Sequence, residues 1–350
     1  MDATGVSNER QQRPSQARES WPTVDQLVAL PNDELAKVDP VVMNLVVAKG
    51  IPALGNLDIG HYVGLADHWA AEIEQHIPAG DANFYRNPER LQNDLDFSRL
   101  AVAWWYVEKV LRISYRKDQR GLTQVLYTNP TDLFLNGVMD TMQGTCGNMA
   151  ALYVALCWRL GWPVSLACVG AHHVARYDDG QKTFNVEVSR YGEGCGICSP
   201  PDRCYMEDNK LPQRAVDCGS DLRAVTPREM LGLFVGLRAR HLENKRLIAE
   251  SEPDYLLARY LFPKNRHLHV AQGRISVQCS MRLLEPHEKG HPIELSEWLQ
   301  EVVRVVPLPQ ARFEKSIENV KKPQEKTDGN CIDAVFEETT FDGDFMGDLM

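Results

Sequence analysis

The sequence predicts an α+β fold, mostly helical with one small antiparallel sheet, from three observations. Apolar residues recur at helical spacing through the first third of the chain. Runs rich in β-branched residues then follow one another between residues 164 and 189, separated by short polar breaks. Helical patterns return after residue 226. With 350 residues, 43% of them hydrophobic, the chain can bury a large core.

The first third is predicted to be a layer of helices. Asp39 followed by Pro40 is typical of a helix start, and Asp58 opens a second helix. A third helix is indicated by four apolar residues at helical spacing, which are Leu100, Trp104, Val107 and Leu111. Tryptophans in such a stripe are mostly buried, so we interpret Trp104 and Trp105 as core residues rather than as part of a cofactor pocket.

A helical hairpin is predicted after the sheet. Residues Thr226 to Glu229 form a capping box with proline at the first helical position. The second helix of the hairpin is predicted to run from Pro253 to Phe262, before Pro263. We interpret residues 274–284 as a strand that follows it. No repeat of fixed period is present in the chain, which argues against a solenoid.

The two ends of the chain differ in composition from the rest. The start is polar, and the end from Asp328 onward is acidic with no Lys or Arg. Its Phe336, Phe341 and Phe345 would suit a short motif that docks on a protein partner, the alternative being a tail that only solvates the chain. We divide the chain into a disordered leader (1–22), a core domain with its helical layer (23–220), a helical appendage (221–310) and an acidic, disordered tail (311–350).

Charge and hydropathy exclude several functions. The formal net charge of −10 disfavours binding to nucleic acid and to anionic membrane. No window reaches the roughly 18 apolar residues of a membrane span, and the first residues lack the apolar centre of a signal peptide. Nine cysteines without a disulfide-like framework are read as mostly reduced thiols. We therefore expect a cytoplasmic protein.

Cys146 is a candidate nucleophile because it stands at the head of a predicted helix. The helix is marked by an apolar stripe, which consists of Met149, Leu152, Tyr153, Leu156 and Leu160. Free amide groups and the helix dipole at this end would stabilise a thiolate, and the amide of Cys146 would serve as one oxyanion donor. Gly144 would let a substrate carbonyl come close. The alternative is a buried structural cysteine, which is how we interpret Cys157 in mid-helix.

A base for this thiol is offered by the predicted hairpin. Asp179-Gly180 is the favoured type I′ turn, and it would place His172 directly opposite Glu187 on one face. His173 would then face away, opposite Val186. We predict His172 as the base and Glu187 as the acid that orients it, the alternative being a pair that only stabilises the hairpin.

Five ordered motifs carry a resemblance to a known family. They are Gly144-Thr145-Cys146, Leu152-Tyr153-Val154-Ala155, Arg159-Leu160-Gly161, the run from Ala171 to Arg176, and Phe184-Asn185-Val186-Glu187. This pattern resembles bacterial transglutaminase-like core proteins, a branch of the papain-like cysteine fold. Two positions depart from it: Ala171 stands where Gly is usual, and Glu187 where the superfamily mostly has Asp.

The resemblance implies a fold and a chemistry. The fold would be a Cys-bearing helix packed on a small antiparallel sheet, and the site would be the triad of Cys146, His172 and Glu187. Such cores transfer acyl groups from a protein or peptide amide through a thioester, without a cofactor. Water as acceptor gives proteolysis or deamidation, and an amine gives crosslinking. The alternative is an inactive relative that acts as a protein-binding module.

Several other residues are weighed for ligand roles. Gln143 is the nearest candidate for a second oxyanion donor, the alternative being a solvated loop residue. Four cysteines, namely Cys195, Cys198, Cys204 and Cys218, have in part the spacing of a zinc site, but a loop that merely contains cysteines is the preferred interpretation. His267 and His269 alternate as in a strand and are read as structural. No glycine-rich phosphate loop follows a strand, which argues against nucleotide binding.

Overall fold

A computed structural model of the chain describes residues 21–120, 125–190 and 197–284, and within them the fold is α+β as predicted. The helices before the main sheet are α1 (Val24–Ala29), α2 (Asn32–Leu35), α3 (Pro40–Ala48), α4 (Ile59–Arg86), α5 (Leu95–Trp105), α6 (Leu135–Thr141) and α7 (Cys146–Arg159). Those after it are α8 (Asp202–Asp208), α9 (Gln213–Asp217), α10 (Pro227–Asn244), α11 (Ile248–Leu261) and α12 (Arg266–Leu284). Residues 1–20 of the predicted leader and the whole acidic tail lie outside the described residues.

The predicted helix starts at Asp39, Asp58 and Thr226 are confirmed. The Asp39 carboxylate accepts a hydrogen bond from the amide of Val41 at 2.8 Å and so caps α3. The Asp58 carboxylate accepts one from the third residue of α4 at 3.3 Å. At α10 the Thr226 hydroxyl and the Glu229 carboxylate satisfy each other's backbone amides, as a capping box requires.

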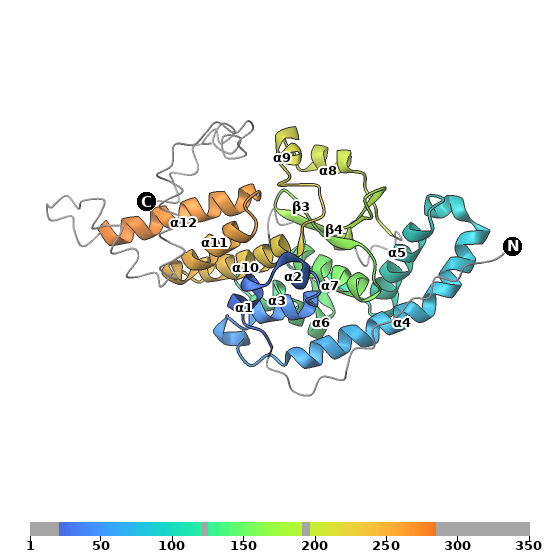
Figure 1. Cartoon of the computed structure of the whole chain (residues 1–350), viewed down its shortest axis with the longest axis horizontal. Helices are drawn as coiled ribbons and strands as arrows, with labels where there is room; N and C mark the ends of the chain where they lie inside the picture. The colour runs from blue at the N-terminus through green and yellow to red at the C-terminus, as the bar shows by residue number, and fades with distance from the viewer. Residues whose placement is uncertain (1–20, 121–124, 191–196, 285–350) are drawn as a thin grey trace.

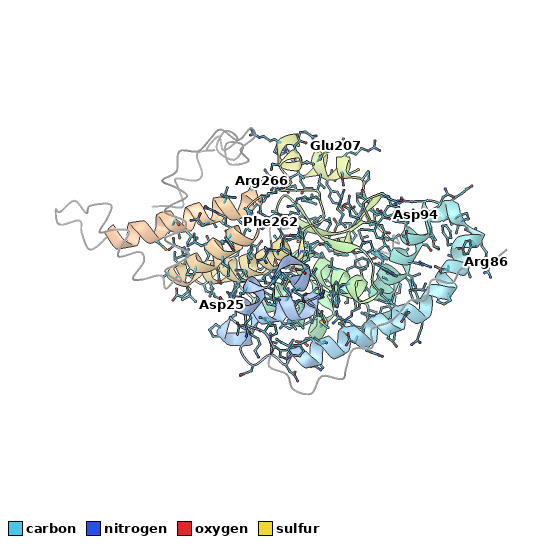
Figure 2. The ribbon with its side chains drawn as sticks, in the orientation of Figure 1. Asp25, Arg86, Asp94, Glu207, Phe262 and Arg266 are labelled. Atoms are coloured by element: carbon cyan, nitrogen blue, oxygen red, sulfur yellow. The ribbon has the colours of Figure 1, made fainter. Side chains whose placement is uncertain are left out.

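The main sheet consists of β3 (Val164–Val169), β4 (His172–Asp178) and β5 (Thr183–Val186), antiparallel in that order. One face of the sheet packs in the main core with α7. The other face carries Ala167, Val169 and Val174, which pack against Tyr205 of α8 and against Leu211 and Leu222. In Figure 1 the sheet lies between α7 on one side and α8 with α9 on the other. Figure 2 places Glu207 of α8 beyond the sheet and Arg86 at the outer end of α4.

A second, very short sheet lies at the start of α7. Strand β1 (Ser114–Tyr115) pairs in parallel with β2 (Gln143–Gly144), so that Tyr115 lies opposite Gly144. Hydrogen bonds from the amide of Ser114 to the carbonyl of Met142 at 3.1 Å and from the amide of Arg116 to that of Gly144 at 2.8 Å hold the two segments together. This sheet was not predicted, because two-residue strands leave no periodic pattern.

The strand predicted at residues 274–284 is wrong, since these residues belong to α12. Ala271, Ile275 and Cys279 recur every four residues and pack against a small cluster on α10 and α11. Ile275 is fully buried there. The helical spacing of these contacts, rather than the local β propensity, decides the structure.

Two further predictions need correction. Helix α11 begins at Ile248 rather than at Pro253, because buried Ile248 and the hydroxyl of Ser251, which donates to its carbonyl at 2.8 Å, hold one more turn before the proline. Trp104 is a core residue, as predicted, but Trp105 is 42% exposed and meets the ring of His76 edge-on. Neighbours on a helix point about 100° apart, so only one of the two faces the core.

One apolar core connects most of the described elements. Its members run from Leu27 of α1 to Leu268 of α12 and include the buried side of α7. The hairpin of α10 and α11 therefore contributes to the same core as the N-terminal helices. Among the helices that the structure describes, none has the length and apolar character needed to cross a membrane.

Candidate active site

Cys146 is the first residue of α7, and the turn that carries it is held firmly. The Thr145 hydroxyl donates to the carbonyl of Asp132 at 2.8 Å, and the Thr145 amide donates to the side chain of Asn148 at 2.8 Å. A Cβ at Gly144 would lie 2.5 Å from Met149 and 2.6 Å from Asn148. Close packing therefore requires glycine at position 144. The sequence suggested another reason for this glycine, which was the approach of a substrate carbonyl.

The sulfur of Cys146 is buried among polar groups. The residue is 6% exposed but belongs to none of the apolar clusters. Burial raises the pKa of its thiol, yet hydrogen bonds with His172 and His173 lower it by more, to about 6. In Cys157 and Cys168, where burial dominates, the pKa is raised instead. Cys146 is therefore the thiol that ionises near neutral pH among these three.

His172 connects the thiol to a carboxylate. It follows the two-residue turn at Gly170 and Ala171, and its Nε2 lies 2.7 Å from Oε2 of Glu187. Burial lowers the pKa of His172, but the hydrogen bonds with Cys146 and Glu187 raise it by more, to about 10. Because Nε2 faces the carboxylate, Nδ1 is left to face the thiol. Between pH 6 and 10 the arrangement therefore favours a thiolate and an imidazolium.

Glu187 has each of its oxygens engaged. It directly follows β5 and is 6% exposed. Oε2 accepts from His172 and, at 3.3 Å, from the hydroxyl of Tyr205, while Oε1 accepts from the amide and hydroxyl of Ser189 at 3.0 and 2.6 Å. Burial raises the pKa of Glu187, but the hydrogen bonds with His172 and Ser189 lower it by more. The pKa is therefore below its usual value and the carboxylate is ionised.

The hairpin register differs from the predicted one by two positions. The strands pair Ala175 with Val186 and Asp178 with Thr183, so His172 is not directly opposite Glu187. The cause is the Asp179 carboxylate, which accepts from the amides of residues 181 and 182 at 2.8 and 2.9 Å and closes a four-residue loop in place of the type I′ turn. A shift of two keeps each residue on its face, and a long carboxylate spans the diagonal.

His173 also contacts the thiol, which the sequence analysis did not predict. Val186 pairs with Ala175 instead of His173, while His173 pairs with Cys168 of β3, and its ring hydrogen-bonds to Cys146. Successive residues of a strand point to opposite faces, so the sulfur lies beside the start of β4, within reach of both histidines. The signal in the sequence was the His-His pair immediately after a tight turn.

The structure does not bring Gln143 into this group. Gln143 is exposed, and the Thr141 hydroxyl donates to its backbone carbonyl at 3.0 Å and accepts from its amide at 3.2 Å. Two tyrosines that the sequence did not indicate lie near the thiol instead. The charge of Cys146 raises the pKa of both Tyr115 and Tyr127, after the larger effect of burial.

The cysteines considered for zinc are not gathered into a site. Cys195 lies outside the described residues, Cys198 and Cys204 are reduced cysteines, and Cys218 is bonded in a disulfide. In the part of the chain that the structure describes, no group of three His, Cys, Asp or Glu side chains is arranged to hold a metal ion. His267 and His269 lie on α12 rather than on a strand, and Nε2 of His269 lies 2.7 Å from the carbonyl of Pro263.

Comparison with known families agrees with the motifs. A model described as the transglutaminase-like superfamily matches residues 62–231, from the first turns of α4 to the start of α10. This range includes Cys146, His172 and Glu187, and we conclude that residues 62–231 are a transglutaminase-like domain. The superfamily generally includes cysteine-based acyltransferases and proteases. No curated protein and no solved structure showed significant similarity to the chain.

Proposed function

We propose that the chain is a cysteine-dependent acyltransferase or hydrolase that acts on a peptide-type amide. Cys146 is the nucleophile, His172 the general base and acid, and Glu187 the group that orients and charges the imidazole. The observation that carries the proposal is the continuous contact from a thiol at a helix N-terminus, through His172, to a buried carboxylate 2.7 Å away.

The reaction would proceed in two steps, which are acylation of Cys146 and transfer of the acyl group to water or to an amine. The Cys146 thiolate attacks the amide carbon, and the carbonyl electron pair moves to oxygen. As this oxyanion collapses, the C–N bond breaks and the His172 imidazolium gives its proton to the leaving amine. Water or a second amine then attacks the thioester while neutral His172 takes its proton, and the thiolate leaves. The site would thus return to its ion pair after each turnover.

The position of the three groups also supports a papain-like arrangement. A helix begins with the nucleophile, an antiparallel strand that packs against this helix starts with the histidine, and the acid directly follows the next strand. The order of the three groups along the chain is Cys, His, acid. We propose this arrangement as the core of the domain, with α1 to α5 and the α10–α11 hairpin as additions around it.

A non-catalytic protein-binding module is the second candidate. The low exposure of Cys146 favours it, because a substrate carbonyl reaches a sulfur that is 6% exposed only if neighbouring groups move. The fold alone does not decide between the two candidates.

Thiol reactivity separates the two candidates. Iodoacetamide labelling of the full chain, read out by mass spectrometry, should modify Cys146 with a rate that rises through pH about 6 instead of the roughly 8.5 of an ordinary thiol. Cys146→Ala should remove the fast phase. Cys204, which is half-buried, serves as an internal control. If Cys146 reacts no faster than Cys204 at pH 6.5, the enzymatic proposal fails and the binding module is favoured.

A further inference from the structure

The two histidines that contact the thiol follow a tight turn between β3 and β4. Val169 pairs with His172 across this turn. Gly170 and Ala171 therefore form the whole loop. Gly170 has a φ of 64°, in the left-handed region that favours glycine. Since His172 and His173 leave the turn directly, a shift of its backbone would move both imidazole rings.

A buried carboxylate from a distant part of the chain holds this turn. Oδ1 of Asp221 accepts a hydrogen bond from the amide of Gly170 at 2.6 Å, and the two residues are 51 positions apart. Asp221 is 1% exposed, so water has little access to the bond. A bond to an ionised acceptor in such a place is stronger than one between neutral groups. Asp221 thus fixes the turn from outside the hairpin.

The backbone around Asp221 is itself attached to the sheet and to α9. The amide of the next residue, Leu222, donates to the carbonyl of Cys168 in β3 at 2.9 Å. The amide of Asp221 donates to the carbonyl of Ala215 in α9 at 3.2 Å. Because bonds hold the backbone at Asp221 and directly after it, the carboxylate has a defined position relative to the turn.

The start of α12 supports the same carboxylate. Nε of Arg266 lies 3.3 Å from Oδ2 of Asp221, and the backbone amide of Arg266 donates to the Ser220 hydroxyl at 3.3 Å. The side-chain amide of Asn265 donates to Sγ of Cys168 at 3.6 Å. Figure 2 labels Arg266 at the end of α12 that lies nearest the sheet. A cation therefore offsets the buried charge, and α12, which lies beyond the residues matched by the family model, is attached to the hairpin.

We propose that Asp221 is a positioning residue of the active site, which holds the turn that carries the two histidines against Cys146. The inference rests on the proposed function. The ring of His173 lies over the first turn of α7, because a Cβ at Gly147 would be 3.9 Å from its Nδ1. A misplacement of about 1 Å in a catalytic group can cost on the order of 100-fold in rate. A clamp on the turn therefore preserves the contacts of both rings with the sulfur.

The experiment compares wild type with three variants of the full chain. Asp221→Ala removes the acceptor of the Gly170 amide. Asp221→Asn retains an acceptor of the same shape and removes only the charge. Asp254→Ala is the matched control, because Asp254 is 8% exposed and forms an ion pair between α11 and α10, with bonds of 2.5 and 2.6 Å to Arg238. It therefore removes a buried acid of the same kind without touching the turn.

The first readout is iodoacetamide alkylation of Cys146 as a function of pH. In Asp221→Ala the histidines are held less well, so the midpoint should rise from pH about 6, and the rate at pH 6.5 should fall by about fivefold. Asp221→Asn should stay within about twofold of the wild-type rate. Asp254→Ala should keep the wild-type midpoint, even where thermal melting shows that its Tm falls as far as that of Asp221→Ala.

The second readout is hydrogen exchange, measured by mass spectrometry on peptides that span residues 168–173. Asp221→Ala should speed exchange there by about tenfold or more, because the Gly170 amide loses its acceptor, while Asp254→Ala should not. If Asp221→Ala does not fold, Asp221→Ala combined with Arg266→Ala takes its place. The double variant leaves no unpaired charge buried and should show the same two changes.

Three results would overturn the inference. In the first, a folded variant without the Asp221 carboxylate keeps the wild-type midpoint or the wild-type exchange. In the second, Asp221→Asn shifts the midpoint as far as Asp221→Ala, which means that the charge acts directly on the histidines. In the third, Asp254→Ala shifts it equally, so that the effect is one of general stability. Failure of the proposed function is distinct, since wild-type Cys146 would then alkylate like Cys204 while the exchange difference remained.

Discussion

Helix α7 carries two cysteines that differ in chemistry although both are buried. Cys157, in the middle of the helix, lies in the main apolar core, and burial raises its pKa. Burial acts in the same direction on Cys146, but the two histidines at the helix tip lower its pKa to about 6. Burial alone therefore does not distinguish an inert thiol from a reactive one. The difference comes from the charged partners that other elements bring to one end of the helix.

The largest expected effect on this contrast comes from His172→Ala. Without the imidazolium, burial raises the pKa of Cys146 toward or above that of an ordinary thiol. The rate of iodoacetamide alkylation at pH 6.5 should fall by about 100-fold, because the thiolate fraction falls by a factor of this order. Alkylation from pH 5 to 10 measures the new pKa directly. A fall of less than about fivefold would contradict the role given to His172.

Glu187→Gln should have the next largest effect. The amide keeps the shape of the side chain but removes the charge that helps to raise the pKa of His172 to about 10. The imidazolium then loses its proton at lower pH, so the fall of the acylation rate on the alkaline side of its pH profile should begin at lower pH. The alkylation rate at pH 6.5 should fall by about tenfold.

Glu187→Asp is the matched control for that variant, since it retains the charge with a shorter reach. We expect its pH profile to lie between those of wild type and Glu187→Gln. The profile is the rate, at each pH, of the burst of 4-nitrophenolate that is released when 4-nitrophenyl acetate acylates Cys146. A Gln variant with the wild-type profile would show that the carboxylate does not set the pKa of His172.

A smaller effect is expected for His173→Ala. His173 also lowers the pKa of Cys146, but it contributes less than His172. The alkylation rate at pH 6.5 should fall by about threefold. The alkaline limb of the pH profile should keep its position because, of the two histidines, His172 is the one that Glu187 contacts. If His173→Ala slows alkylation more than His172→Ala does, the two histidines exchange roles.

Cys157→Ala should have no effect on reactivity and a modest effect on stability. Truncation of this fully buried side chain leaves a small cavity, which should lower the free energy of unfolding by about 1–2 kcal/mol. Urea denaturation measures that change, and alkylation of Cys146 should proceed at the wild-type rate. A change in the rate of Cys146 would mean that the middle of α7 is coupled to its tip.

Sequence patterns predicted the elements that depend on local chemistry. The caps at Asp39, Asp58 and Thr226 follow from hydrogen bonds within one helical turn, so a few neighbouring residues determine them. The pairing of His172 with Glu187 was predicted for a related reason. Alternation along a strand fixes the face on which a residue lies. The predicted register was wrong by two positions, but His172 and Glu187 lie on the same face and are in contact.

The features that were missed depend on contacts distant in sequence or on a single side chain. Tyr115 reaches Cys146 through a pairing of two-residue strands that are far apart in the chain. The four-residue loop results from the Asp179 carboxylate, which competes with the backbone for the turn amides. Residues 274–284 are helical because their neighbours offer a surface that fits helical spacing. None of these causes is visible in periodicity alone.

The length of the hairpin loop at residues 179–182 determines which face of the sheet each side chain of β5 occupies. Adding or removing one residue there would turn every side chain of β5 to the opposite layer and carry Glu187 away from the imidazole. A change of two residues would leave the layers intact and only slide the carboxylate along the ribbon. Tolerance to length variants should therefore alternate between odd and even, and the alkylation rate of Cys146 in such variants would measure how strongly this surface loop is coupled to the site.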